Sequence, residues 1–136
     1  MADPEPYVHV QTRRVVMGEV DVSQIHFTMA YQWMDRGLTE WLAEVGWSFT
    51  RLLNEGVGIP IVNSQCRFER RMLLDDIITL ETSVGGIGTT SFRSRHRFMR
   101  DGELCALGEL THVCIERGDR APVPVPDWIR ERATAD

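Results

Sequence analysis

The chain changes its hydrophobic period once, from a single helix-like segment to a series of strand-like segments. Between residues 29 and 46, apolar side chains recur three or four positions apart, at Ala30, Met34, Leu38, Trp41, Leu42 and Val45. Beyond Gly58 the period becomes two, which is typical of strands that bury one face. Such a chain is expected to fold as one long helix packed on an antiparallel sheet.

The turn and cap residues give the expected boundaries of these elements. We expect strands over residues 7–20, 62–69, 76–84, 89–100 and 103–116, a helix over 29–46 and a short helical turn near 49–54. The last two strands flank Asp101-Gly102, which is a strong hairpin signal. Thr28 is the expected N-cap of the helix and Gly46 its end. Gly37, inside the helix, indicates that the helix approaches the sheet closely.

One helix can cover one face of a five-stranded sheet if the sheet wraps around it, so the expected fold class is α+β. Along residues 89–100 the alternation places Phe92, Ser94, His96 and Phe98 on one face and Arg93, Arg95, Arg97 and Met99 on the other. The second face of the sheet and its edge strand must be shielded from solvent, most simply by a symmetric partner subunit.

Composition narrows the class of protein. The 136 residues suit a single domain over 1–136, with flexible ends expected at 1–6 and 130–136. A net charge of −5 argues against a nucleic-acid binder, and no apolar run approaches the roughly 18 residues of a membrane span. The first ten residues lack the apolar region of a signal peptide. Three widely spaced cysteines without a CxxC pair predict no metal site and a cytoplasmic location.

The segment from Met17 to Trp33 carries the strongest signal for chemistry. Asp21 ends an alternating apolar run, a short polar loop containing His26 follows, and the helix then begins. A helix N-terminus offers unpaired backbone N–H groups and a partial positive charge. A carboxylate beside such an end is suited to acyl-transfer chemistry.

This segment resembles the opening motif of the 4-hydroxybenzoyl-CoA thioesterase family, whose members have the hotdog fold. The matching residues are MGEVDVSQ at 17–24, IHF at 25–27 and AYQWMDRG at 30–37. Later segments also fit: IPIVNSQCRFERRMLLDD, TTSFRSRHRFMRDGELCALGE and PVPVPDWI. The resemblance extends from about Val15 to about Trp128. It implies a five-stranded antiparallel sheet wrapped around one long central helix.

The resemblance also implies a reaction, the hydrolysis of an acyl-CoA or acyl-carrier-protein thioester to a free acid and a thiol. Asp21 matches the family's catalytic carboxylate, acting as nucleophile or as general base. The backbone N–H of Phe27, or that of His26 or Thr28, matches the oxyanion donor. No metal and no cofactor are implied, apart from coenzyme A as part of the substrate. A homodimer or homotetramer is expected.

Other residues have both a functional and a structural interpretation. His26 could polarise the carbonyl or activate water, or be a hydrogen-bonded structural histidine. Asp35 could orient a substrate hydroxyl or be a solvated helix acid. The predicted substrate-binding residues are Thr28, Trp33, Asp35, Thr90, Ser91 and Arg93, and the prediction for Trp33 stands beside its interpretation as a core residue.

Glu40 supports a second class of enzyme. It is the backup carboxylate of the thioesterase hypothesis, and it follows His26 by 14 positions, a spacing that resembles the histidine and helical acid of hotdog dehydratases. A dehydratase or hydratase is therefore the alternative function. A non-catalytic module that binds acyl thioesters is the third hypothesis.

The chain departs from the family pattern at three points, two in the loop after Asp21 and one in the turn where some relatives bind coenzyme A. Gln24 stands where the family has glycine, and the loop from Asp21 to the helix is expected to be one residue shorter. The Gly85–Thr90 turn lacks the cationic cluster that some relatives use for the phosphates of coenzyme A. Arginines that could replace that cluster are Arg93, Arg95, Arg70 and Arg71.

Overall fold

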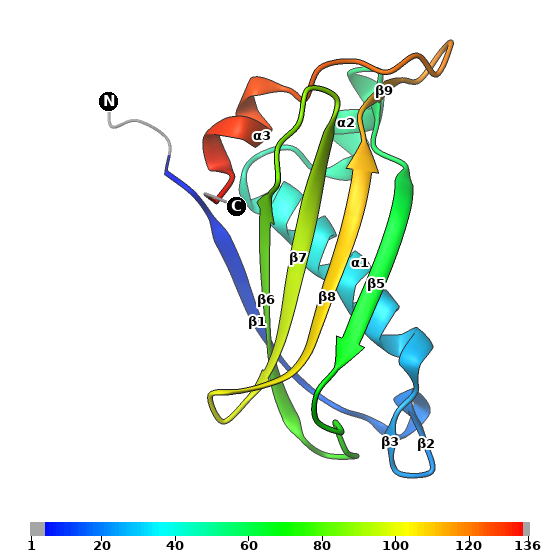
Figure 1. Cartoon of the computed structure of the whole chain (residues 1–136), viewed down its shortest axis with the longest axis vertical. Helices are drawn as coiled ribbons and strands as arrows, with labels where there is room; N and C mark the ends of the chain where they lie inside the picture. The colour runs from blue at the N-terminus through cyan, green and yellow to red at the C-terminus, as the bar shows by residue number, and fades with distance from the viewer. Residues whose placement is uncertain (1–4, 135–136) are drawn as a thin grey trace.

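The structure is a computed structural model that describes residues 5–134, and it shows one long helix packed against one face of a five-stranded sheet (Figure 1). The elements are β1 (Val8–Arg14), the 3-10 turn η1 (Met17–Glu19), β2 (Val20–Asp21), β3 (Gln24–Ile25), α1 (Phe27–Glu44), α2 (Phe49–Asn54), β4 (Val57–Gly58), β5 (Ile61–Phe68), β6 (Ile77–Gly85), β7 (Ser91–Arg100), β8 (Glu103–Val113), β9 (Ile115–Glu116) and α3 (Asp127–Arg132). The expected α+β class is confirmed.

All pairings in the main sheet are antiparallel, in the order β1-β6-β7-β8-β5. The β7–β8 hairpin turns through Asp101 and Gly102, whose φ angles of 50° and 78° are those of the predicted turn. On β7, Phe92 and Phe98 are buried against α1, and the arginines face away from it. Arg93 pairs with Glu109 at 3.3 Å and Arg97 with Glu81 at 3.6 Å, which partly neutralises the arginine row.

Two predicted boundaries at the N-terminal end are wrong. The strand expected over residues 7–20 ends at Arg14, because the backbone N–H of Val16 donates to the Glu19 carboxylate at 3.0 Å and the chain turns through η1. The helix begins at Phe27 rather than residue 29, and His26 replaces Thr28 as its N-cap. At the other end α1 finishes at Glu44, and Gly46 follows with a φ of 91°.

The two ends of the described chain are hydrogen-bonded to other elements, the first to α3 and the last to β6. The Tyr7 N–H donates to the Arg132 carbonyl at 3.0 Å, and the Thr134 N–H donates to the Val84 carbonyl at 2.7 Å. The flexible end expected from residue 130 is therefore hydrogen-bonded through Thr134. The predictions for residues 1–4 and 135–136 lie outside the described residues. Near this end, Trp47 and Trp128 stack with their ring centroids 4.7 Å apart.

Gly37 lies where α1 packs closely against the sheet. A Cβ at this position would overlap Thr82 Oγ1 on β6 and would lie 3.1 Å from His96 Nδ1 on β7. The close approach predicted from this glycine is confirmed. It also brings the helix backbone against a buried group of polar side chains.

That group is a hydrogen-bonded chain that runs across β6, β7 and β8. Its links are Thr82 Oγ1 to His96 Nδ1 at 3.1 Å, His96 Nε2 to Ser94 Oγ at 3.0 Å, Ser94 Oγ to His112 Nε2 at 3.1 Å and His112 Nδ1 to the Ile59 carbonyl at 3.1 Å. The Ile59 carbonyl can only accept, so the proton of the neutral His112 ring lies on Nδ1, and its Nε2 accepts from the Ser94 hydroxyl. Ser94 Oγ in turn accepts from His96 Nε2, and His96 Nδ1 accepts from the Thr82 hydroxyl.

Burial keeps both of these imidazoles uncharged. Desolvation, aided by the neighbouring His112, lowers the pKa of His96 to about 3. Desolvation also lowers the pKa of His112, against the opposing hydrogen bond to Ile59. The polar chain therefore belongs to the core, and it fixes how the sheet meets α1.

Candidate active site

Asp21 lies in a two-stranded hairpin at one end of the molecule. It pairs with Gln24 across β2 and β3, and the two residues between them, Val22 and Ser23, have positive φ angles of 43° and 76°. These angles define a tight hairpin turn that usually takes asparagine or glycine. Val22 is β-branched and 94% exposed, so packing of its side chain does not require the strained backbone conformation.

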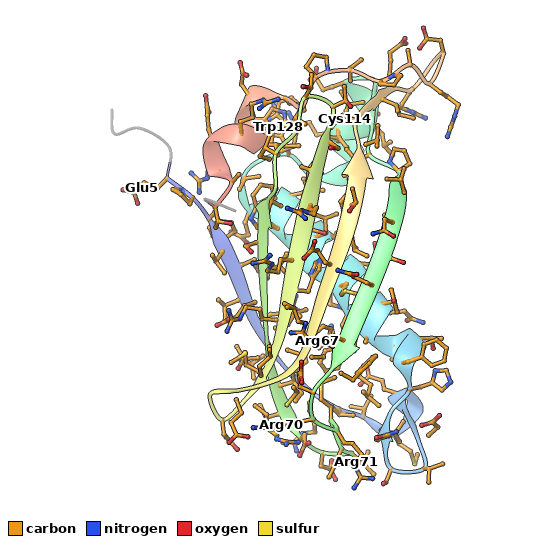
Figure 2. All side chains as sticks on the ribbon, viewed as in Figure 1. Glu5, Arg67, Arg70, Arg71, Cys114 and Trp128 are labelled. Atoms are coloured by element: carbon orange, nitrogen blue, oxygen red, sulfur yellow. The ribbon has the colours of Figure 1, made fainter. Side chains whose placement is uncertain are left out.

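The connection between β5 and β6 holds this hairpin in place. The Ile25 N–H donates to the Met72 carbonyl at 2.7 Å, and the Leu74 N–H donates to the Ser23 carbonyl at 3.0 Å. The segment thus adds to the hairpin like a third strand. It brings Arg70 and Arg71 to the same end of the molecule (Figure 2).

Backbone hydrogen bonds identify which amide at the helix start is free. The N–H of His26 donates to the Glu19 carbonyl at 2.8 Å, that of Thr28 to His26 Nδ1 at 3.2 Å, and that of Met29 to the His26 carbonyl at 2.9 Å. Phe27 is the first residue of α1, so its N–H has no acceptor within the helix. Of the three donors considered from the sequence, the Phe27 amide is the one that the other contacts leave available.

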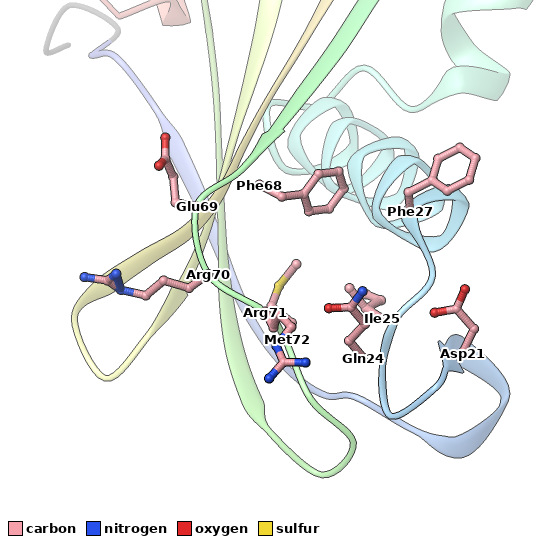
Figure 3. Close-up of a pocket in the computed structure, with 9 residues that line it drawn as sticks. All are labelled: Asp21, Gln24, Ile25, Phe27, Phe68, Glu69, Arg70, Arg71 and Met72. Carbon is pink, nitrogen blue, oxygen red and sulfur yellow. The ribbon is translucent and has the colours of Figure 1, made fainter.

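Asp21 and Phe27 line the same open cavity of about 360 Å³ (Figure 3). The cavity has an apolar part and a polar part. Its lining residues are Asp21, Gln24, Ile25, Phe27, Phe68, Glu69, Arg70, Arg71 and Met72. An acid, a free amide and aromatic walls in one cavity can bind an acyl group and stabilise an oxyanion.

His26 stands next to Asp21, with its Nε2 atom 3.8 Å from Asp21 Oδ2. Its other nitrogen, Nδ1, accepts the Thr28 N–H and lies 2.7 Å from Thr28 Oγ1. The sequence therefore placed Asp21, His26, Phe27 and Thr28 correctly in one neighbourhood. Only Asp21 and Phe27 of these four line the cavity.

The remaining predicted residues lie elsewhere. Trp33, Asp35 and Glu40 line a second cavity of about 590 Å³, which opens beside Arg13 of β1. Trp33 is itself buried in the core. From Phe27 to Glu40 the helix advances about 20 Å, so within one chain Glu40 cannot assist a reaction at Asp21.

Thr90, Ser91 and Arg93 lie at the far end of β7. A ten-residue strand spans about 30 Å, and its other end, Arg100, donates to the Arg71 carbonyl near the candidate site. Within one chain, the structure does not bring these three residues to Asp21.

Sequence reasoning missed residues in and around the site, of which Phe68 and Glu19 are examples. Glu19 is buried, accepts the Trp33 indole N–H at 2.7 Å and shapes the turn that leads into β2. Its place two residues before Asp21 in the motif was the only signal for it. Phe68 closes the cavity from β5, and no local pattern could show that an alternating strand ends beside the helix start.

The comparisons with known proteins agree with this architecture. Residues 15–133 match the model of the thioesterase-like superfamily. The chain therefore belongs to the thioesterase-like superfamily, and its hotdog fold is confirmed.

Individual relatives carry names that bear on the enzyme class. A 1,4-dihydroxy-2-naphthoyl-CoA hydrolase of Thermosynechococcus vestitus is 23% identical over 94% of this chain and 92% of its own length. The structure of a gentisyl-coenzyme A thioesterase is 28% identical, with a TM-score of 0.79 over 90% of this chain and 99% of that one. A 1,4-dihydroxy-2-naphthoyl-CoA thioesterase from Synechocystis, 18% identical, superposes with a TM-score of 0.82 over 91% of this chain and 93% of its own. The prediction that the chain is a thioesterase is confirmed; its assignment to the 4-hydroxybenzoyl-CoA subfamily stays a prediction.

The described residues also bear on the predictions about metals and membranes. Residues 5–134 contain no group of three His, Cys, Asp or Glu side chains placed to hold a metal ion. None of the helices within this range is long and apolar enough to cross a membrane. The cytoplasmic location and the independence from cofactors stay predictions.

Proposed function

We propose that the protein hydrolyses an aromatic acyl-CoA thioester in the cavity lined by Asp21 and Phe27. The observation that carries the proposal is that Asp21 and Phe27, whose N–H has no acceptor within the helix, line the same cavity. Phe27 and Phe68 supply aromatic walls, and Gln24 supplies an amide that can hydrogen-bond a ring hydroxyl. The relatives named for gentisyl-CoA and 1,4-dihydroxy-2-naphthoyl-CoA act on aromatic acyl groups.

In this reaction the thioester carbonyl oxygen lies against the Phe27 N–H, which stabilises the negative charge that develops there. The Asp21 carboxylate either attacks the carbonyl carbon or takes a proton from an attacking water. Both routes break the C–S bond, transfer a proton to the departing thiolate and consume one water. Rapid quenching during the first turnover separates the routes, because only attack by Asp21 forms a covalent acyl enzyme.

Thiol release from a panel of aryl and alkyl acyl-CoAs tests the proposal. We expect the wild-type protein to prefer an aryl substrate and Asp21→Asn to lose turnover. Asp75→Asn is the matched control: Asp75 is an exposed acid at the same end of the molecule, and its φ of 72° suits asparagine. Near wild-type turnover by Asp21→Asn would show that the reaction does not use this carboxylate.

The geometry of one chain does not support the alternative dehydratase function, because His26 and Glu40 lie about 20 Å apart along α1. Adding an enoyl-CoA and following its conjugated absorbance tests the point. Loss of that absorbance without thiol release, abolished by Glu40→Gln, would favour the dehydratase over the thioesterase.

The proposal includes a homodimer formed along the β5 edge. Among the described strands β5 pairs only with β8, and Ile61, Val62 and Phe68 leave large apolar surfaces exposed on it. Antiparallel pairing with a second copy would continue the sheet and bring the partner's Ile61 end beside Phe68 and the cavity. It would also turn the end that carries Thr90 and Ser91 toward the site.

Light scattering of the purified protein tests this assembly. We expect a dimer or a tetramer for the wild-type chain and a monomer with reduced turnover for Val62→Asp, since the new carboxylate would be desolvated at the edge. Arg13→Asp, on the opposite edge strand, is the control. A wild-type monomer that still hydrolyses thioesters would contradict the dimer and leave the proposed reaction standing.

A further inference from the structure

The contacts of His26 favour one tautomer of its ring. A backbone amide can only donate, so the Thr28 N–H at 3.2 Å makes Nδ1 an acceptor, and the Thr28 hydroxyl, 2.7 Å from the same atom, can donate to it as well. In the neutral ring the proton then lies on Nε2. The Nε2 atom is turned toward Asp21 Oδ2, 3.8 Å away, so the ring presents an N–H edge to the candidate catalytic carboxylate.

His26 also contacts the candidate oxyanion residue. Its ring stacks on the Phe27 ring with centroids 4.8 Å apart and an angle of 27° between the planes. Because the ring accepts the Thr28 amide, it satisfies the second N–H of the helix and leaves the first, that of Phe27, unpaired. One side chain thus caps the helix, faces the acid and stacks on the residue that supplies the free amide.

We propose that His26 is a positioning residue that acts in its neutral form, as a helix cap on one side and a support for Asp21 on the other. The proposal rests on the thioester hydrolysis proposed above. A protonated Nδ1 cannot accept a hydrogen bond, so protonation of the ring removes the cap from α1. The cationic ring would also sit beside the positive end of the helix.

Groups from four elements surround the ring. From β2, Asp21 faces Nε2, and from α1 the Thr28 amide donates to Nδ1. From η1, the Glu19 carboxylate is turned away, since it accepts from the Trp33 indole and the Val16 amide. From the β5–β6 connection, Arg71 lines the adjoining cavity. With the proton on Nε2, the ring caps the helix start and faces Asp21 with its N–H edge.

Two substitutions separate a positioning role from acid–base catalysis. Asparagine is a good N-cap and alanine is a poor one. We expect His26→Ala to lower kcat about tenfold with little change in KM, and His26→Asn to recover most of that loss. His9→Asn, which replaces a histidine on β1 that lies 3.2 Å from the Tyr7 hydroxyl, is the control and should keep the wild-type kcat and KM.

Long-range 15N–1H spectra of the histidine-labelled protein give a readout that needs no activity. We expect the proton of the His26 ring on Nε2 at neutral pH. A proton on Nδ1 would overturn the proposal, as would recovery of His26→Ala by added imidazole or equal defects in His26→Ala and His26→Asn. A wild-type protein that releases no thiol would instead refute the proposed function, while the spectra still test the tautomer.

Discussion

The molecule contains two side-chain clusters built around histidine, and they differ in how completely their polar groups are paired. In the buried chain, each ring nitrogen of His96 and His112 has a hydrogen-bond partner. In the exposed cluster, the Phe27 amide has no intrahelical acceptor and Asp21 lies 3.8 Å from His26, beyond hydrogen-bond distance. The first cluster has no capacity left for a ligand, whereas the second has a donor and an acceptor free in a cavity.

The same contrast holds for the backbone that carries each cluster. The buried chain sits on three central strands in regular register beneath Gly37. The exposed cluster sits on a two-residue hairpin turn with two positive φ angles and no glycine. Strain of this kind persists where surrounding contacts hold it, and here the β5–β6 connection does so. The comparison predicts that the buried cluster determines stability and the exposed cluster determines activity.

The largest expected effect is on turnover. Asp21→Asn should lower kcat by at least about 10³-fold, because removing a group that acts directly on the substrate has costs of this order. Its side chain is 55% exposed, so the free energy of unfolding should change by no more than about 0.5 kcal/mol. Thiol-release kinetics and urea unfolding of the same preparation check both halves. A large loss of stability would contradict the prediction that the buried cluster determines stability and the exposed cluster determines activity.

The next effect is on stability. His112→Ala should lower the free energy of unfolding by about 3 kcal/mol, because the Ser94 hydroxyl loses its acceptor and the Ile59 carbonyl its donor within the core. Urea denaturation measures this, with His9→Ala as the control on the edge strand. Activity per folded molecule should stay within about twofold of wild type. Loss of kcat in the folded fraction would show that the buried chain takes part in the reaction.

The buried histidines also predict the direction of pH dependence. Their pKa values are lowered in the folded protein, so the unfolded chain binds more protons as the pH falls. The stabilising contribution of the neutral histidines is fully present above the ordinary histidine range. It is lost as the pH falls from about 6.5 toward the lowered pKa values of the folded protein. In that window each histidine should contribute a slope of about 1.4 kcal/mol per pH unit. Unfolding free energies measured at several pH values test this, and an unchanged slope in His96→Gln would contradict the assignment.

The smallest effect concerns the strained turn. Val22→Asn should raise the free energy of unfolding by about 1 kcal/mol, because asparagine adopts positive φ angles more readily than a β-branched residue. Turnover should not change, since the Val22 side chain projects into solvent. Urea unfolding provides the measurement. No gain in stability would mean that the turn conformation is not strained.

The sequence allowed the fold to be predicted where a local pattern was sufficient. The alternation of Phe92 and Phe98 with arginines, the Asp101-Gly102 hairpin and the close approach at Gly37 depend on neighbouring residues or on one backbone position. The helix start was predicted two residues late, because capping by the His26 ring is not among the usual cap signals. The end of the first strand was missed because it depends on a hydrogen bond to Glu19.

The site was predicted only in part for a related reason. Asp21, His26 and Phe27 are close in sequence, so one motif could place them together. Phe68 and Met72 reach the cavity through tertiary packing. Glu40 shared a suggestive spacing with His26, but the advance of α1 separates them into different cavities. Spacing along a helix gives the distance between residues and not the cavity that each one lines.

A crystal structure with a non-hydrolysable aryl-CoA thioether ketone tests the central claim most directly, because it shows which cavity holds the reacting carbonyl. We predict that the ketone oxygen lies within hydrogen-bond distance of the Phe27 amide, with the Asp21 carboxylate facing the carbonyl carbon. An analogue whose carbonyl lies in the cavity lined by Trp33, Asp35 and Glu40 would contradict the account.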